Sequence, residues 1–164
     1  MKNVIFTLFL LHQMFVCGQS EIGLNVNYSR LDAFHGVEYT HAFKRYSIHA
    51  GLDVGVNRTY LQKRFFPRII TGFSYAAVQK EKFKLQPIIQ YSYAPLLFNK
   101  ENRTFAHYHE LSTGIRWRYG KKWKIGQTLL VGALWERSFN AIYQRSKTST
   151  TLGYTAQIDF SYAF

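Results

Sequence analysis

The stretch LGYTAQIDFSYAF, residues 152–164, shows the pattern that decides the fold. Every second residue is apolar or aromatic, and the residues between them are small or polar. Successive side chains of a β-strand point to opposite faces, whereas the apolar stripe of a helix recurs every three to four residues. Residues 152–164 therefore predict a strand with one apolar and one polar face.

The same alternation recurs along the chain and predicts eight strands. They cover residues 22–28, 37–41, 48–56, 69–77, 83–93, 111–119, 123–136 and 152–164. Short connections at 44–45, 79–82 and 120–122 alternate with longer ones at 58–68, 95–106 and 138–150. Short turns at one end and long loops at the other are typical of an up-and-down antiparallel barrel.

Composition limits the class of protein. The chain has 164 residues, enough for one domain, and its single cysteine excludes a disulfide scaffold and a cysteine-rich zinc site. Only 18% of the residues are charged and 18% are aromatic, which argues against disorder and against a coiled coil. The net charge of +12 first suggests a polyanionic partner such as nucleic acid.

The first eighteen residues have the pattern of a cleaved signal peptide. Lys2 precedes an apolar run that is too short to cross a bilayer, and the small residue Gly18 precedes a polar stretch. We therefore expect residues 1–18 to be removed and residues 19–164 to form the barrel. The alternative is a lipoprotein signal ending at Cys17, which the bulky Val16 disfavours. Because the protein is exported, we expect no nucleic-acid partner.

The two faces of the strands indicate which side meets lipid. The polar face carries mostly Gly, Ser, Thr, Asn and Gln, which suits the narrow interior of an eight-stranded barrel. Large aromatic residues such as Tyr28, Trp117 and Trp135 lie on the other face, where they would form girdles at the bilayer interfaces. The prediction is an all-β, eight-stranded antiparallel up-and-down transmembrane β-barrel; a soluble lipocalin-like barrel is the alternative.

The sequence resembles the small eight-stranded outer-membrane barrels of Gram-negative bacteria, of the OmpA and OmpX type. The resemblance rests on the strand and loop pattern and on a last strand that ends on an aromatic residue. It implies a place in the bacterial outer membrane and an encounter with the barrel insertion machinery. The residues implied as the insertion signal are Tyr154, Ile158, Phe160, Tyr162 and Phe164.

Charged residues on the polar face must pair or hydrate, because an isolated buried charge is very expensive. We expect an interior charge network, with a thin path for protons or small ions as the alternative. The residues assigned to it are Glu38, Asp53, Lys84, Arg116, Arg118, Lys124, Glu136 and Asp159, with His49 and Glu110 on the same face. Ile70, Val78, Ile88 and Leu130 also point inward in this register, which favours a plug of side chains over a pore.

Two residues fit the pattern badly. Gln127 falls on the lipid face, where a bulge or a shifted register would relieve its unpaired amide. Pro87 falls inside a strand although it has no N–H to donate, so we expect it near the short-turn end, where pairing is ending.

Some barrels of this size modify the acyl chains of lipid A and need a His and a Ser on one face. Here Ser112 points away from His109, so we expect no catalytic residue. His107 and His109 share a face but have no third converging ligand, so we expect no metal and no cofactor.

The predicted long loops carry most of the remaining cations. They are Arg58, Lys63, Arg64, Arg68, Lys100, Arg103, Arg145 and Lys147. Arginine binds phosphate bidentately, and lipopolysaccharide presents phosphates at this level of the membrane. The sequence thus favours a non-enzymatic outer-membrane barrel whose loops contact lipopolysaccharide, partner proteins or host surfaces. A lipid A acyl-modifying enzyme and a narrow channel are the alternatives.

Overall fold

A computed structural model describes residues 18–62, 65–96, 104–140 and 144–164. Its strands are β1 (Gln19–Ser29), β2 (Ala33–Phe43), β3 (Tyr46–Gly55), β4 (Pro67–Tyr75), β5 (Val78–Gln79), β6 (Phe83–Leu96), β7 (Thr104–Gly120), β8 (Trp123–Asn140) and β9 (Arg145–Ala163). One helical turn, η1 (Asn57–Leu61), follows β3. Within these ranges no helix is long and apolar enough to cross a membrane.

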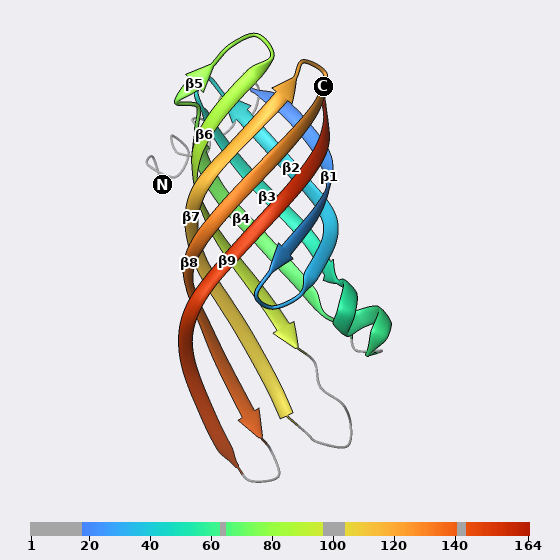
Figure 1. Cartoon of the computed structure of the whole chain (residues 1–164), viewed down its shortest axis with the longest axis vertical. Helices are drawn as coiled ribbons and strands as arrows, with labels where there is room; N and C mark the ends of the chain where they lie inside the picture. The colour runs from blue at the N-terminus through green and yellow to red at the C-terminus, as the bar shows by residue number, and fades with distance from the viewer. Residues whose placement is uncertain (1–17, 63–64, 97–103, 141–143) are drawn as a thin grey trace, which may run out of the picture.

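The strands close on themselves into a barrel (Figure 1). Each long strand pairs antiparallel with its neighbour in the chain, and β1 pairs with β9 to close the ring. Within the described residues, the short strand β5 pairs only with β6, and β4 pairs with β6 as well. Among the described residues, eight long strands thus form the wall, which confirms the predicted all-β, eight-stranded up-and-down barrel.

Apolar side chains cover the outside of this wall and polar ones fill the inside. Leu24 and Leu52 on the outer face are 66% and 63% exposed, whereas Thr128 on the inner face is fully buried. Aromatic rings gather on the outer face near both ends of the strands, with Trp123 stacked on Phe160 at the short-turn end. A water-soluble barrel has the reverse distribution, so this surface is one for lipid.

A bulge interrupts the fourth strand of the wall. Ser74 of β4 pairs with Ile88, but Val78 of β5 pairs with Leu85, so the β4–β5 side has one residue more than β6 over this interval. Pro87 of β6 lies beside this interruption, where its missing N–H costs least. The bulge also corrects one prediction: Val78 is 37% exposed instead of pointing inward, while Ile70, Ile88 and Leu130 are buried as expected.

Strand β8 has a regular register. Its pairing with β7 runs without a break from Lys124 to Asn140, so the bulge or shift expected near Gln127 is absent from this strand. Gln127 lies exposed on the outer face, opposite Trp117 of β7 and Ile158 of β9. Gln127 is the fifth residue of β8, so its amide lies toward the short-turn end of the wall.

The strands at the loop end are longer than the alternation predicts. The connection expected at residues 138–150 is mostly strand, because β8 runs to Asn140 and β9 begins at Arg145. The pairing of β9 with β1 stops at Thr155, so residues 145–154 continue past β1 with β8 as their partner. This β7–β8–β9 extension projects beyond the rest of the barrel in Figure 1.

Candidate functional site

An ion-pair network fills the lumen in its short-turn half. Arg116 of β7 donates two hydrogen bonds across the barrel to Glu38 of β2, at 2.8 and 3.0 Å. Arg118, two residues further on, donates to Glu21 at 2.9 Å and to Glu38 at 3.1 Å. Its Nε also lies 3.3 Å from a carboxylate oxygen of Asp159. These side chains are nearly completely buried. Because Glu38 lies on β2 and Arg116 on β7, the network joins strands from opposite sides of the barrel.

Glu21 completes this network and was missed by the sequence analysis. It forms an ion pair with Lys124 in addition to its pair with Arg118. The signal for it was present, because Glu21 precedes the outward-facing Ile22 and therefore belongs to the inner row of β1. Gly126 supplies the space: a Cβ at that position would lie 2.6 Å from an Asp159 oxygen and 2.9 Å from Arg118 Cγ.

A second ion pair lies in the loop half of the lumen. Arg68 of β4 donates through Nε and Nη2 to one oxygen of Asp53 on β3, at 3.1 and 2.6 Å. It also donates to Asn27 of β1, and its guanidinium lies 3.9 Å from the ring centre of Phe34. The sequence pattern predicts Arg68 in a loop, which is wrong: β4 begins at Pro67, and Arg68 is 1% exposed.

The remaining predicted lumen residues stay outside these two clusters. Lys84 is half-buried near the short-turn end, and Glu136 is half-buried on β8 opposite Tyr108. Neither has an ion pair within the described residues. His49 is fully buried, and its Nε2 lies 3.3 Å from Oε1 of Gln90. Glu110 is also buried, and the positive charge of Arg68 attracts its carboxylate.

Hydrophobic side chains occupy the lumen at the loop end. The cluster consists of Phe34, Phe66, Ala94, Leu96, Ala106, Tyr108 and Leu134, with Leu31 packed against it. Arg58 covers it, because its guanidinium lies 4.5 Å from the ring centre of Phe66 and 5.4 Å from that of Tyr108. Side chains therefore cross the lumen at three levels: this cluster, the Arg68 pair and the Arg116–Arg118 network.

Asp32, in the β1–β2 connection, forms hydrogen bonds with the start of η1. Its carboxylate accepts hydrogen bonds from the backbone N–H groups of Asn57 and Arg58, at 3.1 and 3.0 Å. These are the first residues of η1, whose N–H groups have no partner within the helix. The β1–β2 connection thus holds the start of the β3–β4 loop over the hydrophobic cluster, a contact that strand alternation does not predict.

The histidines of β7 lie on the outer face. Nδ1 of His107 is 2.7 Å from the phenol oxygen of Tyr93, and Nδ1 of His109 is 2.7 Å from that of Tyr91. Ser112 is buried on the inner face, where its hydroxyl donates to the carbonyl of Gln90. The His109–Ser112 combination of an acyl-modifying enzyme is therefore not brought together in this strand.

Next to these histidines the outer surface has a groove of about 320 Å³. It is lined by His107, His109, Arg137, Phe139 and Ser146 of strands β7, β8 and β9. His107 lies directly opposite Arg137 in the sheet. In the described part of the chain, no group of three or more His, Cys, Asp or Glu side chains has a metal-binding arrangement.

The predicted loop cations are distributed over several environments. Arg58 packs on the hydrophobic cluster, whereas Arg145 and Lys147 are exposed at the start of β9. Lys63, Arg64, Lys100 and Arg103 lie outside the described residues, as do Cys17 and the first seventeen residues of the predicted signal peptide. The predicted insertion-signal residues follow the outer face of β9 to the end of the chain, where the N–H of Phe164 donates to the carbonyl of Ser20.

Two solved structures have the same architecture. The N-terminal β-barrel domain of Pseudomonas aeruginosa OprF matches with a TM-score of 0.64 at 7% sequence identity, covering 90% of this chain and 99% of that one. A major outer membrane protein from Thermus thermophilus matches with a TM-score of 0.55 at 8% identity and the same two coverages. No protein-family model and no curated protein matches the sequence. These similarities show the fold: the chain is an eight-stranded transmembrane β-barrel of the outer-membrane type.

Proposed function

We propose that this protein is a non-enzymatic barrel of the bacterial outer membrane that binds a partner protein through the β7–β8–β9 extension. The observation that carries the proposal is the edge of β9. Arg30 donates hydrogen bonds from its guanidinium to the carbonyl of Leu152 and from its backbone N–H to that of Tyr154. Residues 145–151 extend past both Arg30 and the end of β1 toward the loop side. Seven extended residues present an edge of about 20 Å.

An open strand edge is a site for strand addition. Among the described residues, no strand pairs with this edge, so its N–H and C=O groups can accept an extended segment of another chain, and the side chains on the two faces give specificity. The edge reads RSKTSTT, residues 145–151, which is polar and carries two cations. Lys and Arg at an edge discourage self-association, so a partner with acidic side chains fits best.

The groove beside His107 supports lipopolysaccharide contact as a second role. Arg137 lies at its wall, on the outer face and level with the loop-end aromatic residues of β6. A guanidinium in this position can bind a phosphate of lipid A with two parallel hydrogen bonds. Arg145 and Lys147, on the extension, add positive charge further out.

Crosslinking tests the proposed partner site. A photoreactive amino acid replaces Thr148 on the edge or Lys122 in a short turn at the other end, and the labelled chains are irradiated in native outer membranes. We expect a discrete protein adduct from position 148 that is absent from position 122 and is weakened when Arg145 and Lys147 of the edge are both replaced by Glu. An adduct that these substitutions leave unchanged, or only lipid at position 148, would exclude the proposed edge site.

Two measurements address the alternatives. An enzyme acting on lipid A predicts that a knockout changes the acylation pattern seen by mass spectrometry, whereas we expect no change. A channel predicts conductance in planar bilayers, whereas we expect none above background because side chains cross the lumen at three levels.

The mass of the mature chain tests the signal peptide: a chain starting at Gln19 supports cleavage after Gly18, and a lipidated Cys17 would contradict it.

A further inference from the structure

The short-turn end of the barrel holds a cavity of about 470 Å³ that the proposed function does not use. It opens between the β5–β6 and β7–β8 connections and the start of β1. Six of its lining residues are cations and one is a carboxylate. The cations are Lys80, Lys84, Arg118, Lys121, Lys122 and Lys124, and the carboxylate is Glu81.

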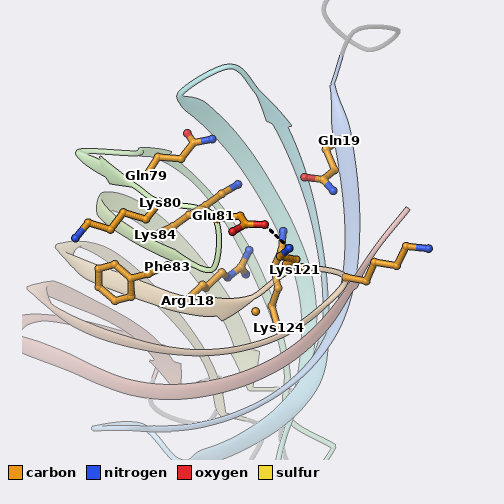
Figure 2. Close-up of a pocket in the computed structure, with 11 residues that line it drawn as sticks. Gln19, Gln79, Lys80, Glu81, Phe83, Lys84, Arg118, Lys121 and Lys124 are labelled. Atoms are coloured by element: carbon orange, nitrogen blue, oxygen red, sulfur yellow. Dashed lines mark ion pairs between the residues drawn. The ribbon is translucent and has the colours of Figure 1, made fainter.

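The lining cations differ in whether a carboxylate neutralises them. Lys121 pairs with Glu81 at the rim (Figure 2). Lys124 and Arg118 pair with Glu21 deeper in. Lys84 has no ion pair within the described residues, although it is half-buried. In Figure 2 its side chain extends toward the cavity, whereas Lys80 extends away from it.

The surroundings of Lys84 leave positive charge uncompensated. Lys124 and Arg118 repel its ammonium group, and Glu21, which attracts it, is already shared by those two cations. Lys80 and Lys122 at the rim also lack an ion pair within the described part of the chain. A concave site with charge of one sign and low-dielectric walls focuses the field and concentrates counter-ions.

We propose that this cavity binds a small phosphate compound of multiple negative charge, with Lys84 as its main contact. A lysine ammonium binds phosphate as a point charge, and the volume lies within the range of small-molecule sites. The phosphate comes either from a soluble phosphate ester or from the headgroup of an anionic phospholipid, and both present the same chemistry to Lys84. The site is at the opposite end of the barrel from the β9 edge, so the two proposals fail separately.

Titration calorimetry with pyrophosphate tests this site. The mature chain, residues 19–164, is folded into phosphatidylcholine nanodiscs, and its folded state is checked by the shift in gel mobility on boiling. We expect saturable binding that Lys84→Gln weakens on the order of tenfold, equivalent to about 1.4 kcal/mol. Lys84→Arg should keep most of the affinity. The matched control is Lys44→Gln, which removes one charge from another short turn that does not line the cavity.

Nanodiscs with added phosphatidylglycerol separate the two sources of phosphate. Competition that lowers the apparent affinity for pyrophosphate assigns the site to a lipid headgroup, and unchanged affinity assigns it to a soluble ligand; either result supports the phosphate site. Two results would overturn it. One is the absence of saturable pyrophosphate binding in phosphatidylcholine discs, and the other is an equal loss of affinity in Lys84→Gln and Lys44→Gln.

Discussion

Arg116 and Glu38 form a two-point ion pair across the lumen, with Nη1–Oε1 and Nη2–Oε2 distances of 2.8 and 3.0 Å. The pair joins β7 to β2, strands from opposite sides of the barrel, and both side chains are almost completely buried. Arg118 shares the same carboxylate, so Glu38 contributes to the neutralisation of two guanidinium groups, although Arg118 also pairs with Glu21 and Asp159. A contact of this kind fixes how the two sides of the wall face each other.

Replacing Glu38 by Gln should therefore be costly. The amide keeps the shape of the side chain but leaves Arg116 and Arg118, both buried, with one anion fewer. Breaking a buried pair in this way costs about 3–5 kcal/mol. We expect that loss in the free energy of unfolding, measured by urea titration in lipid vesicles with tryptophan fluorescence.

Glu81→Gln provides the matched control for this prediction. Glu81 also pairs with a cation, Lys121, but both partners are exposed at the rim. Exposed pairs contribute about 0–1 kcal/mol, so the control should unfold almost like the parent chain. Equal effects of the two substitutions would mean that Glu38 has no special role in holding the barrel together.

The Arg68–Asp53 pair allows a double-mutant test. Arg68→Met leaves the Asp53 carboxylate buried with Asn27 as its remaining hydrogen-bond donor among the described residues, which should cost about 3–5 kcal/mol. Adding Asp53→Asn removes that buried charge, so the double variant should recover much of the loss. Urea unfolding of the four chains measures the coupling. Additive effects would contradict a direct ion pair between the two residues.

Asp32→Ala should loosen the loop end without unfolding the wall. The substitution removes the acceptor for two N–H groups at the start of η1, and loss of such a cap costs about 1 kcal/mol. Arg58 lies in this turn, so limited trypsin digestion of the folded protein should cut there faster than in the parent chain. Unchanged cleavage at Arg58 would show that Asp32 does not hold η1 in place.

The side-chain alternation predicts the wall of the barrel well because it is a local property. In β9 every second residue from Leu152 to Phe160 is exposed, as the sequence indicates. The same rule fails at Val78, since one extra residue in the β4–β5 strand reverses the faces that follow. It also fails at the start of β9, residues 145–150, because this polar segment has no apolar face to reveal it.

The contents of the lumen are harder to predict than the wall. Alternation places Glu38, Arg116, Arg118 and Asp159 on the inner face, but which carboxylate meets which cation depends on strands far apart in sequence. The hydrophobic cluster at the loop end contradicts the simple rule of an entirely polar interior. Phe34 and Phe66 face inward there and pack on each other, and Arg68 lies against Phe34.

The apolar outer face of the strands is a surface for lipid. Spin labels at Leu129, midway along the outer face of β8, and at Lys122 in the adjoining turn test it most directly in lipid vesicles. We expect the label at Leu129 to collide with oxygen, which dissolves in lipid, and to be protected from a water-soluble nickel chelate. The label at Lys122 should show the opposite preference. A label at Leu129 that is as accessible to the nickel chelate as the one at Lys122 would contradict the transmembrane barrel.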